Sequence, residues 1–107
     1  MTTFDKRKDA YESKFARDED LHFKATSRRN RLLGLWAAEK LGKTGEDAET
    51  YVREVIRADF QESGDRDVFR KIRQDFDAAG VEASDHQIER AMEELMARAV
   101  ADVESAR

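Results

Sequence analysis

The sequence Gly42-Lys43-Thr44 resembles the end of a phosphate-binding loop. In such a loop backbone amides surround the phosphates, the lysine contacts the outer phosphates and the hydroxyl group binds magnesium. The full signature requires a glycine where this chain has Ala37, and it requires a preceding strand where this chain has a helical pattern. We therefore interpret Gly42 as the end of one helix and Thr44 as the start of the next. The remaining chemical role is a weak anion site at the amides that follow Thr44.

The histidines and carboxylates suggest no catalytic or metal site. His22 and His86 fall in different predicted helices, and neither has a histidine or cysteine partner at helical spacing. Ser84-Asp85-His86 contains the residue types of a hydrolase triad, but adjacent residues in a helical turn point in different directions, so Ser84 is better explained as a helix cap. The chain has no cysteine, which excludes disulfides and thiol chemistry. We expect no enzyme activity, no metal and no tightly bound cofactor.

The densest basic cluster is Arg28-Arg29-Asn30-Arg31. On a helix these side chains spread around most of the circumference, so one or two could contact an anionic partner while another packs its stem on the protein. The alternative is a surface cluster that offsets nearby acidic residues. The candidate secondary contacts for a partner or an anion are Arg28, Arg29, Arg31, Lys43 and Thr44.

Composition and charge indicate one small domain with an arm. The 107 residues include 20 Lys and Arg against 24 Asp and Glu, a net charge of −4. Residues 1–31 carry +3 and the remainder −7, yet acidic residues interrupt the basic part, which argues against nucleic-acid binding. The longest apolar stretch, residues 35–38, is far shorter than the ~20 residues that span a bilayer. Residues 1–5 show no signal-peptide pattern, so we expect a cytoplasmic protein.

Helical periodicity predicts an all-α fold, a small four-helix bundle with a mobile N-terminal arm. The expected helices are 19–41, 45–63, 66–79 and 85–104, with starts at Thr44, Asp65 and Ser84 and ends at Gly42, Gly64 and Gly80. The predicted inward residues are Leu21, Ala25, Leu32, Leu33, Leu35, Trp36 and Leu41, then Ala48, Tyr51, Val52, Val55, Ile56 and Phe60, then Val68, Phe69, Ile72, Phe76 and Ala79, and finally Ile88, Ala91, Met92, Leu95, Ala99 and Val103.

Residues 1–18 form the predicted arm. Its aromatic residues Phe4, Tyr11 and Phe15 are seven and four residues apart among many charged residues. Burial of three rings contributes about 2 kcal/mol each, whereas ordering the segment costs about 1–2 kcal/mol per residue. We therefore expect an arm with helical tendency that frays alone and folds in the groove of a partner. The pattern does not decide whether the first helix breaks near Asp18.

Several longer strings resemble one family, the zeta subunit of the F-type ATP synthase of alphaproteobacteria. The resemblance covers nearly the whole chain and is densest over residues 2–71. The strings that carry it are Thr2-Thr3-Phe4-Asp5, Lys14-Phe15-Ala16, Arg28-Arg29-Asn30, Leu33-Gly34, Trp36-Ala37-Ala38, Leu41-Gly42-Lys43-Thr44-Gly45, Ala58-Asp59-Phe60 and Asp67-Val68-Phe69-Arg70-Lys71.

The resemblance implies a regulatory inhibitor of ATP hydrolysis. In that family the arm enters a closing interface between the large alternating subunits and the central stalk of the catalytic head, folds as a helix and blocks rotation. Carried onto this sequence, the arm is about Thr2 to Glu19. Its implied apolar anchors are Phe4, Tyr11 and Phe15, and its implied ion-pair partners are Arg7, Lys14 and Arg17.

The resemblance also implies a protein that is monomeric when free and peripheral to the inner membrane through the synthase. Weak ATP or ADP binding is associated with the family. The alternative function is therefore a weak nucleotide-binding sensor that regulates a partner through the four-helix body.

Overall fold

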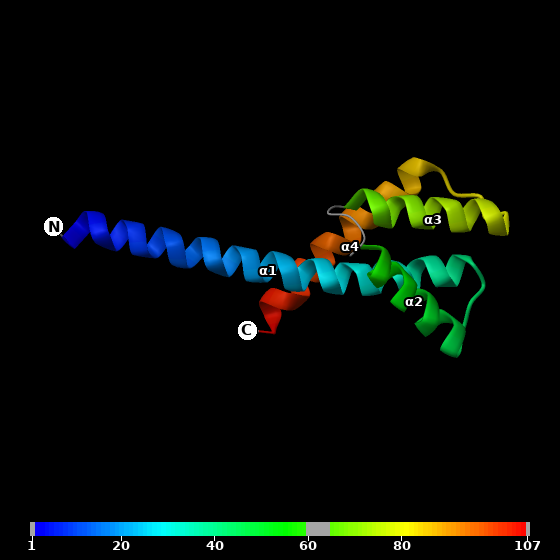
Figure 1. Cartoon of the computed structure of the whole chain (residues 1–107), viewed down its shortest axis with the longest axis horizontal. Helices are drawn as coiled ribbons and strands as arrows, with labels where there is room; N and C mark the ends of the chain where they lie inside the picture. Colours follow the sequence, from blue (N-terminus) through cyan, green and yellow to red (C-terminus); the bar gives the residue numbers. More distant parts are fainter. Residues whose placement is uncertain (1, 60–64, 107) are drawn as a thin grey trace.

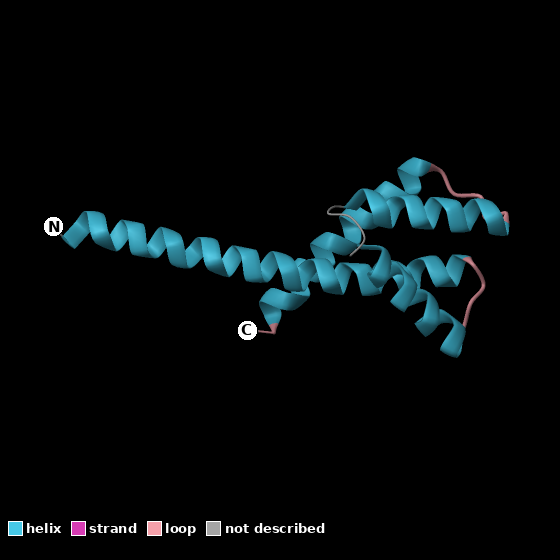
Figure 2. Ribbon diagram, in the orientation of Figure 1, coloured by secondary structure: helices cyan, strands magenta, loops and turns pink. Residues whose placement is uncertain are grey.

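Four α-helices make up nearly all of the described chain. The computed structural model describes the backbone of residues 2–59 and 65–106 and the side chains of residues 19–59 and 66–106. The helices are α1 (Thr2–Lys40), α2 (Gly45–Asp59), α3 (Asp65–Ala79) and α4 (Asp85–Ser105). Figure 2 shows no strand in this described part. The predicted all-α, four-helix fold is confirmed.

Helix α1 is the longest helix and runs along most of the length of the molecule. Its 39 residues correspond to a rod of about 58 Å, close to the longest molecular extent of 64 Å. Figure 1 shows its C-terminal half beside α2 and α4, while its N-terminal part extends beyond them. The helix is continuous through Asp18, so the structure shows one helix where the sequence did not decide between one and two. The division into an arm and a four-helix domain stays a prediction.

Two glycines end helices as predicted. Gly42 and Gly80 adopt left-handed φ angles of 76° and 71°, a conformation that glycine adopts without a steric penalty. After α1, the Lys43 amide donates to the Ala38 carbonyl at 2.9 Å; after α3, the Val81 amide donates to the Phe76 carbonyl at 2.9 Å. These bonds satisfy carbonyls at the two helix ends. The predicted end at Gly64 lies outside the described residues.

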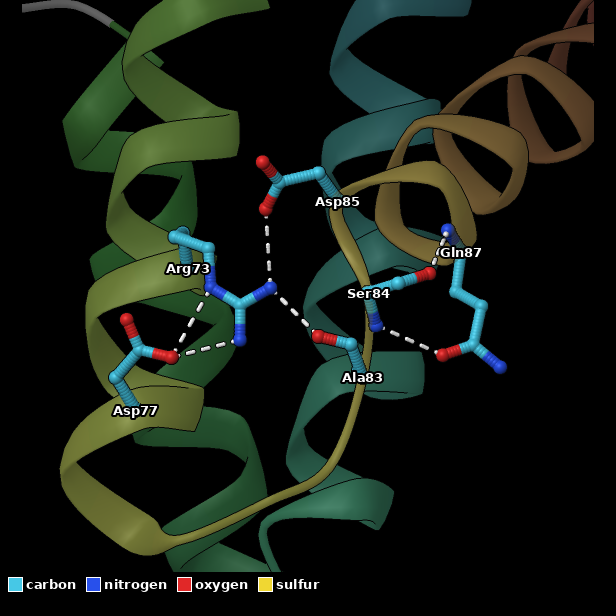
Figure 3. Close-up of polar contacts among 6 residues, drawn as sticks. All are labelled: Arg73, Asp77, Ala83, Ser84, Asp85 and Gln87. Carbon is cyan, nitrogen blue, oxygen red and sulfur yellow. Dashed lines mark hydrogen bonds and ion pairs between the residues drawn. The ribbon is translucent and has the colours of Figure 1, made fainter.

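α4 begins at the predicted cap Ser84, which forms a capping box with Gln87. The Gln87 amide donates to the Ser84 hydroxyl at 3.1 Å, and the Ser84 amide donates to the Gln87 side chain at 2.8 Å (Figure 3). Arg73 of α3 holds the preceding loop, because its guanidinium donates to the Ala83 carbonyl at 2.6 Å and to Asp85 at 3.1 Å. α2 begins after Thr44, whose backbone carbonyl accepts hydrogen bonds from the Asp47 and Ala48 amides of the first turn.

The core lies where α1, α2, α3 and α4 converge, and most predicted inward residues take part in it. The buried apolar residues are Ala25, Leu33, Ala37, Ala38, Tyr51, Val52, Val55, Val68, Ile72, Phe76, Ile88, Ala91, Met92 and Ala99. Trp36 is partly buried, and its ring lies 5.7 Å from that of Phe76. Two assignments are wrong, because Leu35 is 36% exposed and Ala79 is exposed at the last turn of α3. Phe60 lies outside the described residues.

Gly34 allows the close approach of α1 and α2. A Cβ atom at this position would lie 3.0 Å from the Val52 Cα atom, which is tighter than ordinary packing. Gly34 therefore serves helix packing and not a turn.

Candidate partner-binding arm and its anchorage

The predicted partner contacts of the arm lie in the part of α1 that extends beyond the body. Residues 2–18 form about 25 Å of helix (Figure 1). In this helix the Cα atoms of residues 4, 11 and 15 fall on one side, because steps of seven and four residues are close to whole turns. The side chains of the six predicted contacts lie outside those described: Phe4, Arg7, Tyr11, Lys14, Phe15 and Arg17.

Two ion pairs hold α1 to the body close to the arm. The Arg28 Nε atom donates to the Asp102 carboxylate of α4 at 2.9 Å, with Arg98 3.9 Å from the same oxygen. Three residues further along α1, Arg31 lies 3.8 Å from Glu49 of α2. Each such exposed pair contributes about 0–1 kcal/mol. Arg28 and Arg31 therefore link α1 to two neighbouring helices, in addition to any role toward a partner.

Arg29 is the arginine of residues 28–31 that packs on the body. Its side chain is 1% exposed and that of Asn30 is 2% exposed, and the Arg29 Nε atom donates to the Asn30 side-chain oxygen at 2.9 Å. Successive residues of a helix are 100° apart, so the middle arginine faces the body while Arg28 and Arg31 remain exposed. Arg29 is a structural residue in this fold, and the accessible pair is Arg28 and Arg31.

The other predicted anion contacts, Lys43 and Thr44, lie at the far end of the body. Both are exposed in the connection between α1 and α2. Arg28 and Arg31 lie about 14–18 Å before the end of α1, so the fold does not gather the basic candidates into one site. The Lys43 ammonium lies 5.9 Å from the Tyr51 ring. It borders a cavity of about 270 Å³ lined by Leu41, Lys43, Tyr51, Glu54, Asp75, Ala78 and Ala79.

A polar network that the sequence analysis missed joins α2 to α3 beside this cavity. The Tyr51 hydroxyl donates to Asp75 at 2.8 Å, and the Lys71 ammonium donates to the same carboxylate oxygen at 3.1 Å. Lys71 also lies 3.5 Å from Glu54 and 5.2 Å from the Tyr51 ring centroid. Burial, and then the hydrogen bond to Asp75, raise the pKa of the Tyr51 hydroxyl well above its usual range. The residues of this network come from two helices, so no regular spacing in the sequence predicts that they meet.

The substitution Tyr51→Phe tests this network through the pH dependence of stability. At pH 7 the variant should lose about 1 kcal/mol with the hydrogen bond. Because the folded-state pKa is raised, the stabilisation is present below the unfolded pKa of about 10 and is lost as pH rises above it. Urea unfolding at pH 7 and at higher pH should therefore show a difference that narrows and then reverses. A constant difference across this range would contradict the assignment.

Neither a metal site nor a membrane-spanning helix is found among the described residues. No group of three or more His, Cys, Asp or Glu side chains among them is arranged to hold a metal ion. None of the helices in the described part has a stretch that is both long and apolar enough to cross a membrane.

Comparisons with known proteins agree with the resemblance found in the sequence. A solution NMR structure of a protein 42% identical to this chain superposes with a TM-score of 0.70 and covers 81% of this chain and 99% of that one. No curated protein sequence matches significantly. The family model described as ATPase inhibitor subunit zeta matches residues 1–102, almost the full length. The projecting helix, the four-helix body and this match lead to one conclusion: the chain belongs to the ATPase inhibitor subunit zeta family.

Proposed function

We propose that this chain inhibits ATP hydrolysis by an F-type ATP synthase and that residues 2–19 are the inhibitory element. The observation that carries the proposal is the continuous helix α1, which projects from the body in a protein of an ATPase inhibitor family. The partner is the catalytic head, where the arm occupies an interface between the large alternating subunits and the central stalk. Through this partner the chain is cytoplasmic and peripheral to the membrane, and it is monomeric when free.

The mechanism is that of a helix inserted into a moving interface. The arm's aromatic positions recur on one side of the helix, so a groove of the head can bury them together. Rotation in the hydrolytic direction closes that groove on the arm, whereas rotation in the synthetic direction opens it. The inhibition is therefore directional, and the chain regulates the enzyme without catalysing a reaction.

The four-helix body holds α1 and so fixes the point from which the arm projects. Ala25 is the first buried residue among the α1 side chains that the structure describes, and the Arg28–Asp102 and Arg31–Glu49 pairs join the next turns to α4 and α2. Because the arm continues a helix that the body holds in place, it can adopt fewer orientations before binding than a free peptide can. Part of the orientational cost of binding is then met before the arm meets the head.

The substitution Phe15→Ala tests the proposed insertion. If the ring is buried in the head, the half-inhibitory concentration for ATP hydrolysis should rise about 5- to 150-fold, corresponding to about 1–3 kcal/mol. The measurement is a titration of the isolated catalytic head with the full-length chain. Leu35→Ala is the control, because Leu35 is an exposed apolar residue of the body. Equal potency of Phe15→Ala and the unmodified chain would count against insertion of this ring.

A second candidate function is weak binding of ATP or ADP by the body. The favouring observation is the cavity next to Lys43 and Tyr51, which offers an ammonium group beside an aromatic ring. Glu54 and Asp75 also line this cavity, so repulsion of phosphates keeps the affinity low. Titration with millimolar nucleotide should shift the amide resonances around Lys43 and Tyr51. An unchanged spectrum would remove this candidate.

A further inference from the structure

Phe23 is an exposed aromatic residue at the junction between the arm and the body. It is 65% exposed, more than any other large hydrophobic residue in the described part of the chain. Single exposed apolar residues are common on protein surfaces, so exposure alone assigns no role. The position of Phe23 on α1 supplies the argument.

Phe23 lies on the strip of α1 that α2 covers further along. Asn30 and Gly34 follow it by seven and eleven residues, which are nearly whole numbers of turns. Asn30 is buried, and Gly34 is in close contact with Val52 of α2. This side of α1 is therefore buried within the body at Asn30 and Gly34, and it is exposed to solvent at Phe23.

The charges around Phe23 limit the chemistry of what could cover it. Glu19 and Asp20 are exposed one turn earlier on the same side of the helix, at spacings of four and three residues. Asp20 also pairs with Lys24 at 3.1 Å. A complementary surface would have an apolar recess for the ring and basic side chains at the recess edge.

We infer that Phe23 is a further contact with the catalytic head and fills an apolar recess edged by lysine or arginine next to the groove that takes the arm. This inference rests on the proposed function. The continuous helix carries it, because Phe23 follows Glu19 by only four residues, about 6 Å along the axis. A groove that binds the arm up to Glu19 therefore brings the surface of the head within reach of Phe23.

The test compares Phe23→Ala with Leu35→Ala in the full-length chain. Both substitutions remove an exposed apolar side chain from α1, but Leu35 lies about 18 Å further along the helix. Phe23→Ala should raise the half-inhibitory concentration about tenfold, and Leu35→Ala should leave it unchanged. Phe23→Leu should retain most of the potency. The thermal unfolding midpoint of Phe23→Ala should match that of the unmodified chain because Phe23 is 65% exposed, and inhibition by all variants is measured well below the midpoint of Leu35→Ala.

The outcomes separate this inference from the proposed function. If Phe23→Ala inhibits like the unmodified chain while deletion of residues 2–19 abolishes inhibition, the Phe23 contact is refuted and the arm stands. If Phe23→Ala weakens inhibition while the deletion has no effect, the arm mechanism is refuted, and the placement of the Phe23 recess beside an arm-binding groove is refuted with it. Equal weakening by Phe23→Ala and Leu35→Ala would overturn the inference, because it would indicate no localised contact.

Discussion

A chain that lacks residues 2–19 is expected to leave ATP hydrolysis by the catalytic head uninhibited, even at concentrations at which the full-length chain stops it. The physical reason is that the deletion removes the whole inserted element, including its three aromatic residues. The measurement is the steady-state hydrolysis rate of the isolated head during titration with each form of the chain. Inhibition of equal strength by the shortened chain would refute the proposed role of the arm.

The shortened chain should remain folded, which makes the experiment interpretable. The buried apolar residues described in the structure begin at Ala25, so the deletion leaves the core intact. Circular dichroism should show less total helix but a similar unfolding midpoint, because the lost segment lies outside the body. A large decrease in the midpoint would instead indicate that the segment supports the body.

The second large effect is expected for Phe76→Ala, which should lower the free energy of unfolding by about 3–5 kcal/mol. Phe76 has no exposed surface, and its ring lies 5.7 Å from the ring of Trp36. The substitution leaves a cavity where α3 packs in the core, and small domains have only about 5–15 kcal/mol of total stability. Urea unfolding followed by the fluorescence of Trp36, the single tryptophan, measures the loss.

Phe23→Ala is the matched control for Phe76→Ala, because it is the same chemical change at a position that is 65% exposed. Its effect on the free energy of unfolding should be within about 0.5 kcal/mol. Similar losses for the two variants would contradict the burial of Phe76 in the core.

The features that the sequence predicts correctly depend on local chemistry. Gly42 and Gly80 end helices because their left-handed conformation closes the last turn, and Ser84 with Gln87 starts a helix through reciprocal hydrogen bonds. Apolar residues at intervals of three and four identify the inner faces of α2 and α4, because residues at these spacings lie on one side of a helix. Each of these signals involves residues that are at most a few positions apart.

The features that the sequence does not predict depend on how the helices are placed. Helix α1 contacts both α2 and α4, so a wide part of its circumference is covered, and its apolar residues alone do not define that part. Leu35 is consequently exposed, although the pattern indicates that it faces inward, and the pattern does not identify Arg29 as the arginine that is buried. The partner of Arg28 is Asp102, which lies 74 positions away in the chain. No spacing rule connects residues at such a separation.

Because α1 is one continuous helix from the body to its N-terminal end, a small tilt of the helix at the body causes a large displacement of that end. The stretch of α1 before Ala25 is about 35 Å long, so a tilt of roughly 10° where α1 meets α2 and α4 displaces its N-terminal end by about 6 Å. That displacement exceeds the width of one side chain. The ion pairs of Arg28 and Arg31 lie close to this stretch, and their contribution to its direction weakens as the salt concentration rises.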